Sequence, residues 1–127
     1  MAKLTRILQA LAHPTRRRIT ALLRVRDELC VCEIVDALRL PQYQVSRHLR
    51  TLRSAGVVTG SRQGRWMHYR LNPRLARADR GMVAAICERA DAEPAVRADA
   101  LRLQACLRPR DGCAPRILLC AKRRSRT

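Results

Sequence analysis

QYQVSRHLRTLRSAG, residues 42–56, is the stretch that decides the fold. Within it, Val45, Leu49 and Leu52 recur at the spacing of one face of a helix. Gly56 follows them, as a glycine commonly follows the last turn of a helix. The stretch therefore predicts a helix with one apolar face and one polar face that carries several arginines.

Three further apolar stripes precede this helix, and prolines mark two of the boundaries. Pro14 can open a helix, and Pro41 breaks the chain just before residue 42. Each stripe has helical spacing, which predicts three helices upstream of the quoted one. The stripes are Leu4, Ile7, Leu8 and Leu11, then Ile19, Leu22 and Leu23, then Val31, Ile34, Val35 and Leu38.

The periodicity changes after Gly56. Residues 57–62 and 66–71 have the pattern of two short strands, and Gln63-Gly64 is the expected turn between them. Helical stripes then resume at Met82, Val83, Ile86 and Cys87, and at Val96, Ala100, Leu103 and Leu107. We expect a mainly α fold with a small β-hairpin, which is the order of elements in a winged helix-turn-helix.

The expected organisation is a winged helix-turn-helix domain over residues 1–90, a C-terminal helix over 91–108 and a flexible tail over 109–127. Residues 101–127 hold eight Lys and Arg against one Asp, so the tail is strongly basic.

Charge and composition restrict the possible partners. The 127 residues have a formal net charge of +17, which favours nucleic acid as the partner, although an arginine-rich genome could also produce such a surface. No apolar run is long enough to span a membrane, and the N-terminus lacks a signal-peptide core. We therefore expect a cytoplasmic protein with no membrane partner, whose six cysteines are reduced.

In a winged helix-turn-helix the second helix of the pair enters the major groove of double-stranded DNA. Glutamine can pair with adenine and arginine with guanine, while other polar side chains contact phosphates. The hairpin tip can reach the minor groove or the backbone. The alternative for a polar helix face is simple solvation, and for His48 a hydrogen bond within the core. The predicted DNA-binding residues are Gln42, Gln44, Ser46, Arg47, His48, Arg50, Thr51, Arg62 and Arg65.

A second motif is ELCVCEIVDAL, residues 28–38. If Cys30 and Cys32 both lie in the first helical turn, their side chains point about 200° apart, so one ion can hold both only if the turn distorts. A helix N-terminus stabilises thiolates, and Arg24 and Arg26 are expected to assist. The alternative is that both cysteines are small buried hydrophobic residues. For Cys87, on an apolar stripe, packing is the favoured interpretation.

LAHPTRRRITALL, ELCVCEIVDAL, QVSRHLRTLRSAGVV and RQGRWMHYRL occur in this order between residues 11 and 71. Together they resemble the ArsR/SmtB family of metal-responsive repressors, in its CVC-bearing, arsenite-responsive branch. The resemblance implies homodimers that bind an inverted-repeat operator without any cofactor and release it when metal binds. It also implies dimerisation through the first helix and the helix that follows the wing.

The chain departs from the family pattern in two places. The position of a third cysteine in close arsenite repressors is Val35, so a third sulfur would have to come from elsewhere, such as Cys113 or Cys120 in the tail. Residues 76–90 contain no histidine, which argues against the zinc site of another branch. Cys30 and Cys32 are the predicted metal ligands, with As(III) as inducer and Sb(III), Cd(II) or Pb(II) as alternatives.

The sequence thus predicts a homodimeric repressor of a metalloid-resistance operon. The alternatives are a Cd- or Pb-responsive or thiol-redox-responsive repressor of the same family, and a constitutive basic nucleic-acid-binding protein. An enzyme is not expected, since no nucleophile–base pair, phosphate-cradling loop or carboxylate pair is recognisable.

Overall fold

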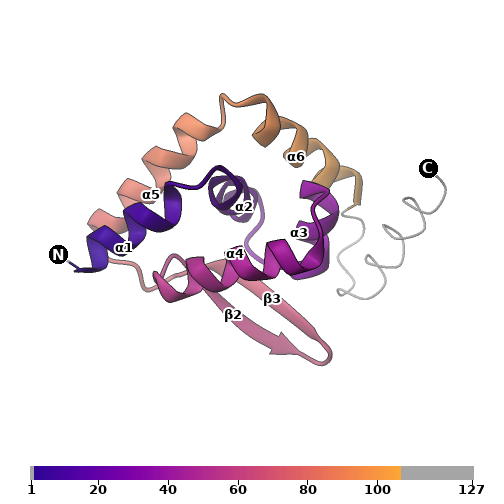
Figure 1. Ribbon diagram of the computed structural model, residues 1–127, viewed down its shortest axis with the longest axis horizontal. Coiled ribbons are helices and arrows are strands. Elements are labelled where there is room, and N and C mark those ends of the chain that lie inside the picture. Colours follow the sequence, from indigo (N-terminus) through magenta and orange to yellow (C-terminus); the bar gives the residue numbers. More distant parts are fainter. Residues whose placement is uncertain (1, 107–127) are drawn as a thin grey trace.

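The computed structural model describes residues 2–106 of the chain. Helix α2 runs through the middle of the molecule, and the other helices surround it (Figure 1). Leu107, the expected tail and the two tail cysteines lie outside the described residues. The elements are α1 (Ala2–Leu11), α2 (Pro14–Val25), β1 (Leu29–Cys30), α3 (Val31–Leu38), α4 (Gln42–Ser54), β2 (Val58–Gln63), β3 (Trp66–Leu71), α5 (Arg77–Ala90) and α6 (Pro94–Cys106).

The predicted helices form because their ends are satisfied locally. Pro14 occupies the first turn of α2, and His13 before it accepts a hydrogen bond from the backbone N–H of Thr15 at 3.1 Å through Nδ1. At the end of α4, Gly56 has a positive φ of 81°, and the N–H of Val57 returns to the carbonyl of Leu52. This termination turns the chain into the hairpin.

The sheet has three antiparallel strands in the order β1-β3-β2, one more than the predicted hairpin. β1 was missed because two residues are too short to show an alternating pattern. The predicted turn was also wrong by one residue. Gln63 belongs to β2 and pairs with Trp66, so that Gly64 and Arg65 form the turn. Gly64 supplies the positive φ that such a tight turn needs.

The core lies between α2 and the elements around it. Ile19 and Leu22 of α2 are fully or almost fully buried with Ile34 of α3 and Leu49 of α4. Leu103 of α6 is buried in the same cluster, so α6 packs into the domain. None of the helices within residues 2–106 is long and apolar enough to cross a membrane.

A buried ion-pair network ties α6 to the centre. Asp99 is fully buried and accepts two hydrogen bonds from Arg18 and one from Arg102, each at 2.8 Å. The same guanidinium groups donate to the carbonyls of Leu38 and Ala37 at the end of α3. The hydrogen bond to Asp99 raises the pKa of Arg18 above its usual value. This network fixes the C-terminal end of α3 against α2 and α6.

Candidate nucleic-acid interface and thiol site

The polar face of α4 points away from the core, as the periodicity predicted. Arg47 and Arg50 are exposed, and Thr51 is partly exposed. The Thr51 hydroxyl donates to the carbonyl of Arg47 at 3.3 Å, so it is engaged with its own helix. The remaining predicted residues of this face are also accessible: Gln42 is exposed, and Gln44 and Ser46 are partly exposed.

His48 differs from the other predicted DNA-binding residues because it is buried at 9% exposure. Its ring lies 4.5 Å from the ring of His13, and its Nδ1 lies 3.5 Å from Nη1 of Arg16. Burial, with the neighbouring His13, Arg16 and Arg47, lowers the pKa of His48. His48 therefore packs on the side of α4 that faces α2, which agrees with the alternative considered for it from the sequence.

The hairpin extends beyond the helices (Figure 1). Arg62 near the end of β2 and Arg65 in the turn are both exposed. Gln63 between them donates to Glu28 at 3.0 Å, which ties the hairpin to the segment before β1. The hairpin thus presents two arginines at a tip that Gln63 ties to Glu28.

The position of Cys30 differs from the prediction. Cys30 is not in the first turn of α3 but is its N-cap residue, with extended backbone (φ −73°, ψ 149°), because its pairing with β3 holds it in a strand. Its backbone N–H donates to Oε1 of Glu33 at 2.8 Å, and in return its side chain faces the backbone N–H of Glu33, forming a capping box. Cys32 lies in the first turn itself.

The two cysteines have different environments. Cys30 is fully buried, whereas Cys32 is partly exposed. Arg24, expected near them, instead points to α5, where it donates to the carbonyl of Ala84 at 3.5 Å and reaches Cys87. Sequence proximity misled here because α2 ends before the chain returns through β1.

Cys87 is a packed residue, as expected. It is fully buried, and burial raises the pKa of its thiol to about 11; Arg24 lowers this pKa to a smaller extent, and Asp91 raises it. Its thiol is therefore protonated at neutral pH, which disfavours it as a metal ligand.

His68 lies beside this motif, and no pattern in the sequence predicted that position. In the β1–β3 pair, Cys30 is directly opposite His68. Nδ1 of His68 lies 3.3 Å from Oε2 of Glu28, and His68 is buried at 8% exposure. The neighbourhood of Cys30 is thus built by three segments, although no group of three or more His, Cys, Asp or Glu within residues 2–106 is arranged to hold a metal ion.

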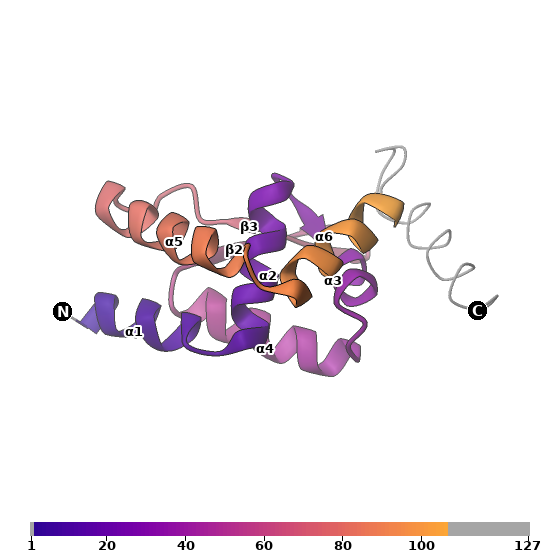
Figure 2. The ribbon, with the colours of Figure 1, turned by 90° about the horizontal axis from the view of Figure 1, so that it is seen from above.

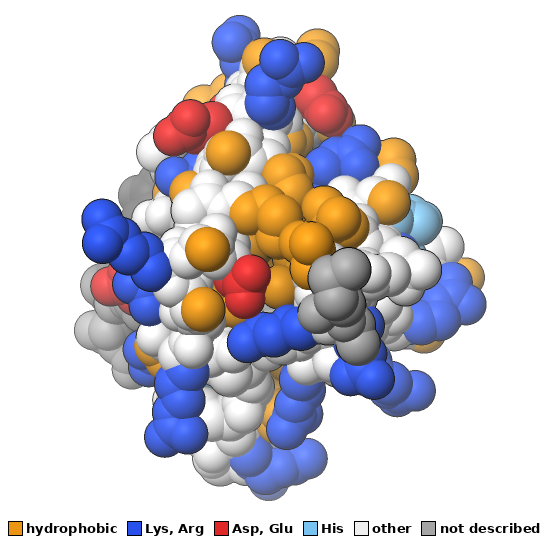
Figure 3. Space-filling view, turned by 90° about the vertical axis from the view of Figure 1, so that its left-hand side faces the viewer, with side chains coloured by type: hydrophobic (Ala, Val, Ile, Leu, Met, Phe, Trp, Pro, Cys, Tyr) orange, Lys and Arg blue, Asp and Glu red, His pale blue; other side chains and the backbone are white. Residues whose placement is uncertain are grey.

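An apolar surface lies on the side of the molecule where α1 and α5 run. Leu4 and Leu8 of α1 are 42% and 46% exposed, and Met82 and Ile86 of α5 are partly exposed. Figure 3 faces this side and shows hydrophobic side chains gathered near its middle, with basic side chains around them. Leu8 and Ile86 both line a cavity of about 580 Å³ between the two helices.

A helix-turn-helix of α3 and α4, followed by the β2–β3 hairpin, defines a winged helix-turn-helix domain. The model of the bacterial regulatory protein arsR family matches residues 13–59. The chain belongs to this family, whose members and relatives are transcriptional regulators and not enzymes.

Known proteins resemble about half of the chain or more. The arsenic resistance transcriptional regulator ArsR1 of Pseudomonas putida is 46% identical over 69 residues, which are 54% of each chain. The repressor SmtB of Mycobacterium tuberculosis is 54% identical over 65 residues, covering 51% of this chain and 47% of SmtB. The chain thus spans about half the length of these relatives. The structure of the repressor PagR of Bacillus anthracis superposes with a TM-score of 0.57 at 30% identity, covering 67% of this chain and 93% of PagR.

Proposed function

We propose that the chain is a homodimeric repressor that leaves an inverted-repeat operator when As(III), or Sb(III), binds Cys30 and Cys32. Family membership supports the repressor function, and the names of relatives such as ArsR1 support arsenic as the signal. The observation that carries the mechanism is the position of Cys30 as the N-cap of α3.

The DNA-binding part of the proposal rests on α4 and the hairpin tip. Arg47 and Arg50 lie on the exposed face of a helix that carries no acidic residue, and Arg62 and Arg65 extend the positive surface along the wing. Arginine at such positions can pair with guanine or with phosphates. His48 is the weakest member of the predicted set because it is buried against His13.

The sensing part follows from the local bonding of Cys30. To share an ion with Cys32, the Cys30 side chain would have to leave its place in the capping box with Glu33. The N–H that Glu33 accepts is buried, so disturbing this arrangement costs free energy. That cost falls on α3, whose C-terminal end is fixed by Arg18 and Arg102 and which packs on α4. A strained α3 would therefore displace the DNA-reading helix.

The donor set fits a soft, thiophilic ion only in part. Cys30 and Cys32 supply two sulfurs, and Val35 stands where a third would be expected from the family pattern. Within residues 2–106 no third ligand completes a group. Cys113 or Cys120, which lie outside the described residues, could supply the third sulfur, as could a small external thiol.

The apolar surface on α1 and α5 supports dimerisation. Leu4 and Leu8 are 42% and 46% exposed in the single chain, and contact of these large apolar side chains with water is unfavourable in free energy. If two copies pair across this surface, Leu4 and Leu8 become buried. The dimer then carries two α4 helices, one for each of two operator half-sites that lie about one helical turn of DNA apart.

Operator titration by fluorescence anisotropy tests the proposal, with the protein kept under a phosphine reductant. As(III), Cd(II) and Pb(II) are added separately, and peroxide is added to protein from which the reductant has been removed. The proposal expects As(III) to release the operator at the lowest concentration. If only Cd(II), Pb(II) or peroxide releases the operator, that agent is the inducer in place of As(III). No response to any of them would indicate a constitutive DNA-binding protein.

A further inference from the structure

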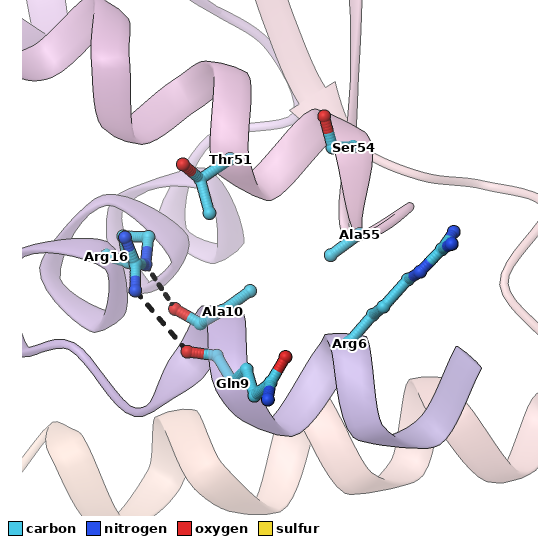
Figure 4. A pocket seen from close by; sticks show the side chains of 7 residues that line it. All are labelled: Arg6, Gln9, Ala10, Arg16, Thr51, Ser54 and Ala55. Atoms are coloured by element: carbon cyan, nitrogen blue, oxygen red, sulfur yellow. Dashed lines mark hydrogen bonds between the residues drawn. The ribbon is translucent and has the colours of Figure 1, made fainter. Parts of the chain in front are cut away.

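A second basic site adjoins the polar face of α4. A pocket of about 550 Å³ lies between α1, the start of α2 and the C-terminal end of α4 (Figure 4). Arg6, Gln9 and Ala10 line it from α1, Arg16 from α2, and Thr51, Ser54 and Ala55 from the end of α4. None of these residues was predicted to bind DNA except Thr51.

The pocket keeps its shape because Arg16 fixes α1 to α2. Nε of Arg16 donates to the carbonyl of Ala10 at 2.6 Å, and Nη2 reaches the carbonyl of Gln9 at 3.4 Å. Ala10 and Ala55 face each other across the pocket with methyl groups only, which leaves its centre open (Figure 4). The third nitrogen of the guanidinium lies 3.5 Å from Nδ1 of His48, beneath the DNA-reading face.

The positive charge of the helices around the pocket is only partly compensated by acidic residues. Helices α1, α2 and α4 together carry nine Lys and Arg and no Asp or Glu. Arg6 is exposed, and none of the ion pairs among the described residues includes it. Lys3 and Arg18, by contrast, are paired with Asp79 and Asp99. Positive charge that has no internal partner beside a DNA-reading helix is suited to an external anion.

We propose that this pocket binds a phosphate of the DNA backbone, with Arg6 as the contacting residue and Arg16 as the residue that positions α1. The proposal rests on the proposed DNA-binding function and extends it from α4 to α1. Thr51 and Ser54 belong both to the exposed part of α4 and to the pocket wall. The DNA backbone at the edge of the major groove that α4 enters therefore lies next to the pocket. Because α1 is also the proposed dimer helix, the contacted phosphates lie between the two half-sites.

The test compares salt dependence on operator and on random DNA for wild type, Arg6→Ala, Arg6→Lys and Gln9→Glu. Loss of one phosphate contact lowers the slope of log affinity against log salt by about 0.9, and a two-fold dimer loses two such contacts. Arg6→Ala should therefore flatten the slope by roughly 2 and weaken both DNAs by the same factor. Arg6→Lys should keep the slope, and Gln9→Glu, which adds a negative charge of similar shape, should weaken both DNAs.

The matched control is Arg97→Ala, which removes an exposed arginine from α6, on the opposite side of α2 from α4 (Figures 1 and 2). It should leave the slope unchanged. All variants are assayed at concentrations where sedimentation velocity finds only dimer. Ethylation interference shows which phosphates are contacted. Ethyl groups on the central phosphates should weaken DNA binding by the wild type and have no effect on DNA binding by Arg6→Ala.

An unchanged slope for Arg6→Ala overturns the inference, and operator preference in the wild type would then still support the proposed function. Absence of operator preference in the wild type contradicts the proposed function itself. Inorganic phosphate, exchanged for chloride at constant ionic strength, separates the two sources of the anion. If phosphate raises the melting temperature only when Arg6 is present, while the Arg6→Ala slope is normal, the pocket binds a free anion and the DNA contact is refuted.

Discussion

The carboxylate of Glu33 accepts the backbone N–H of Cys30 at 2.8 Å, although both residues are almost completely buried. Cys30 thereby couples the end of β1 to the first turn of α3. The same residue that would donate a sulfur to a metal ion is thus the residue that begins the helix.

Replacing Glu33 with alanine should destabilise the protein by about 1–3 kcal/mol, because the buried N–H of Cys30 loses its acceptor. Urea unfolding measures this change. Glu33→Gln keeps an oxygen at the same place and should lose less. If binding of As(III) disturbs the capping box, Glu33→Ala should also release the operator at a lower arsenite concentration. A higher threshold would show that the capping box is kept in the arsenic-bound form.

Cys30→Ser and Cys32→Ser should each bind the operator like the wild type and fail to release it with As(III), since a hydroxyl replaces a soft sulfur ligand. Anisotropy titration of the operator complex measures both properties. Cys87→Ser is the control, because its thiol is buried with a pKa raised to about 11. Normal release by the double Cys30/Cys32 variant would place the sensing site elsewhere.

A chain truncated after Arg110 tests the missing third ligand. If Cys113 or Cys120 completes the site, X-ray absorption should count three sulfurs around arsenic in the full chain and fewer in the truncated chain, without added thiol. A full-length Cys113→Ser/Cys120→Ser variant separates loss of sulfur from loss of tail charge. Three sulfurs in both altered proteins would exclude the tail cysteines as ligands.

Arg47→Ala should weaken operator binding by about 1–3 kcal/mol and relax the preference for one base, since a bidentate arginine contact discriminates by this amount. Binding to a set of operators with single base changes measures it. Arg97→Ala, on α6, is the control for lost charge. An equal loss on operator and random DNA would mean that Arg47 contacts only phosphate.

Leu8→Glu should convert the dimer to monomer, because it places a charge on the apolar surface shared by α1 and α5. Sedimentation velocity measures the change, and operator affinity should fall with it. Leu101→Glu is the matched control, since Leu101 is more exposed, at 68%, but lies on α6. A dimer that survives Leu8→Glu would mean that the chains pair through another surface.

The sequence by itself determined the helices, the hairpin and the buried side of α4. Val45, Leu49 and Leu52 are fully buried, as their spacing predicted, because a helix converts spacing along the chain directly into direction in space. The spacing of Cys30 and Cys32 was equally visible in the sequence, as was the valine at position 35, where the family pattern has a third cysteine.

Only the tertiary structure decided what those residues contact. The pairing of Cys30 with His68 across β1 and β3 moved Cys30 out of the helix, and it joins residues 38 positions apart. Arg24 contacts Cys87, and His48 packs against His13, for the same reason: side-chain partners come from elements that are distant in sequence. Helical periodicity reports which side of a helix is buried, but not which helix or strand covers it.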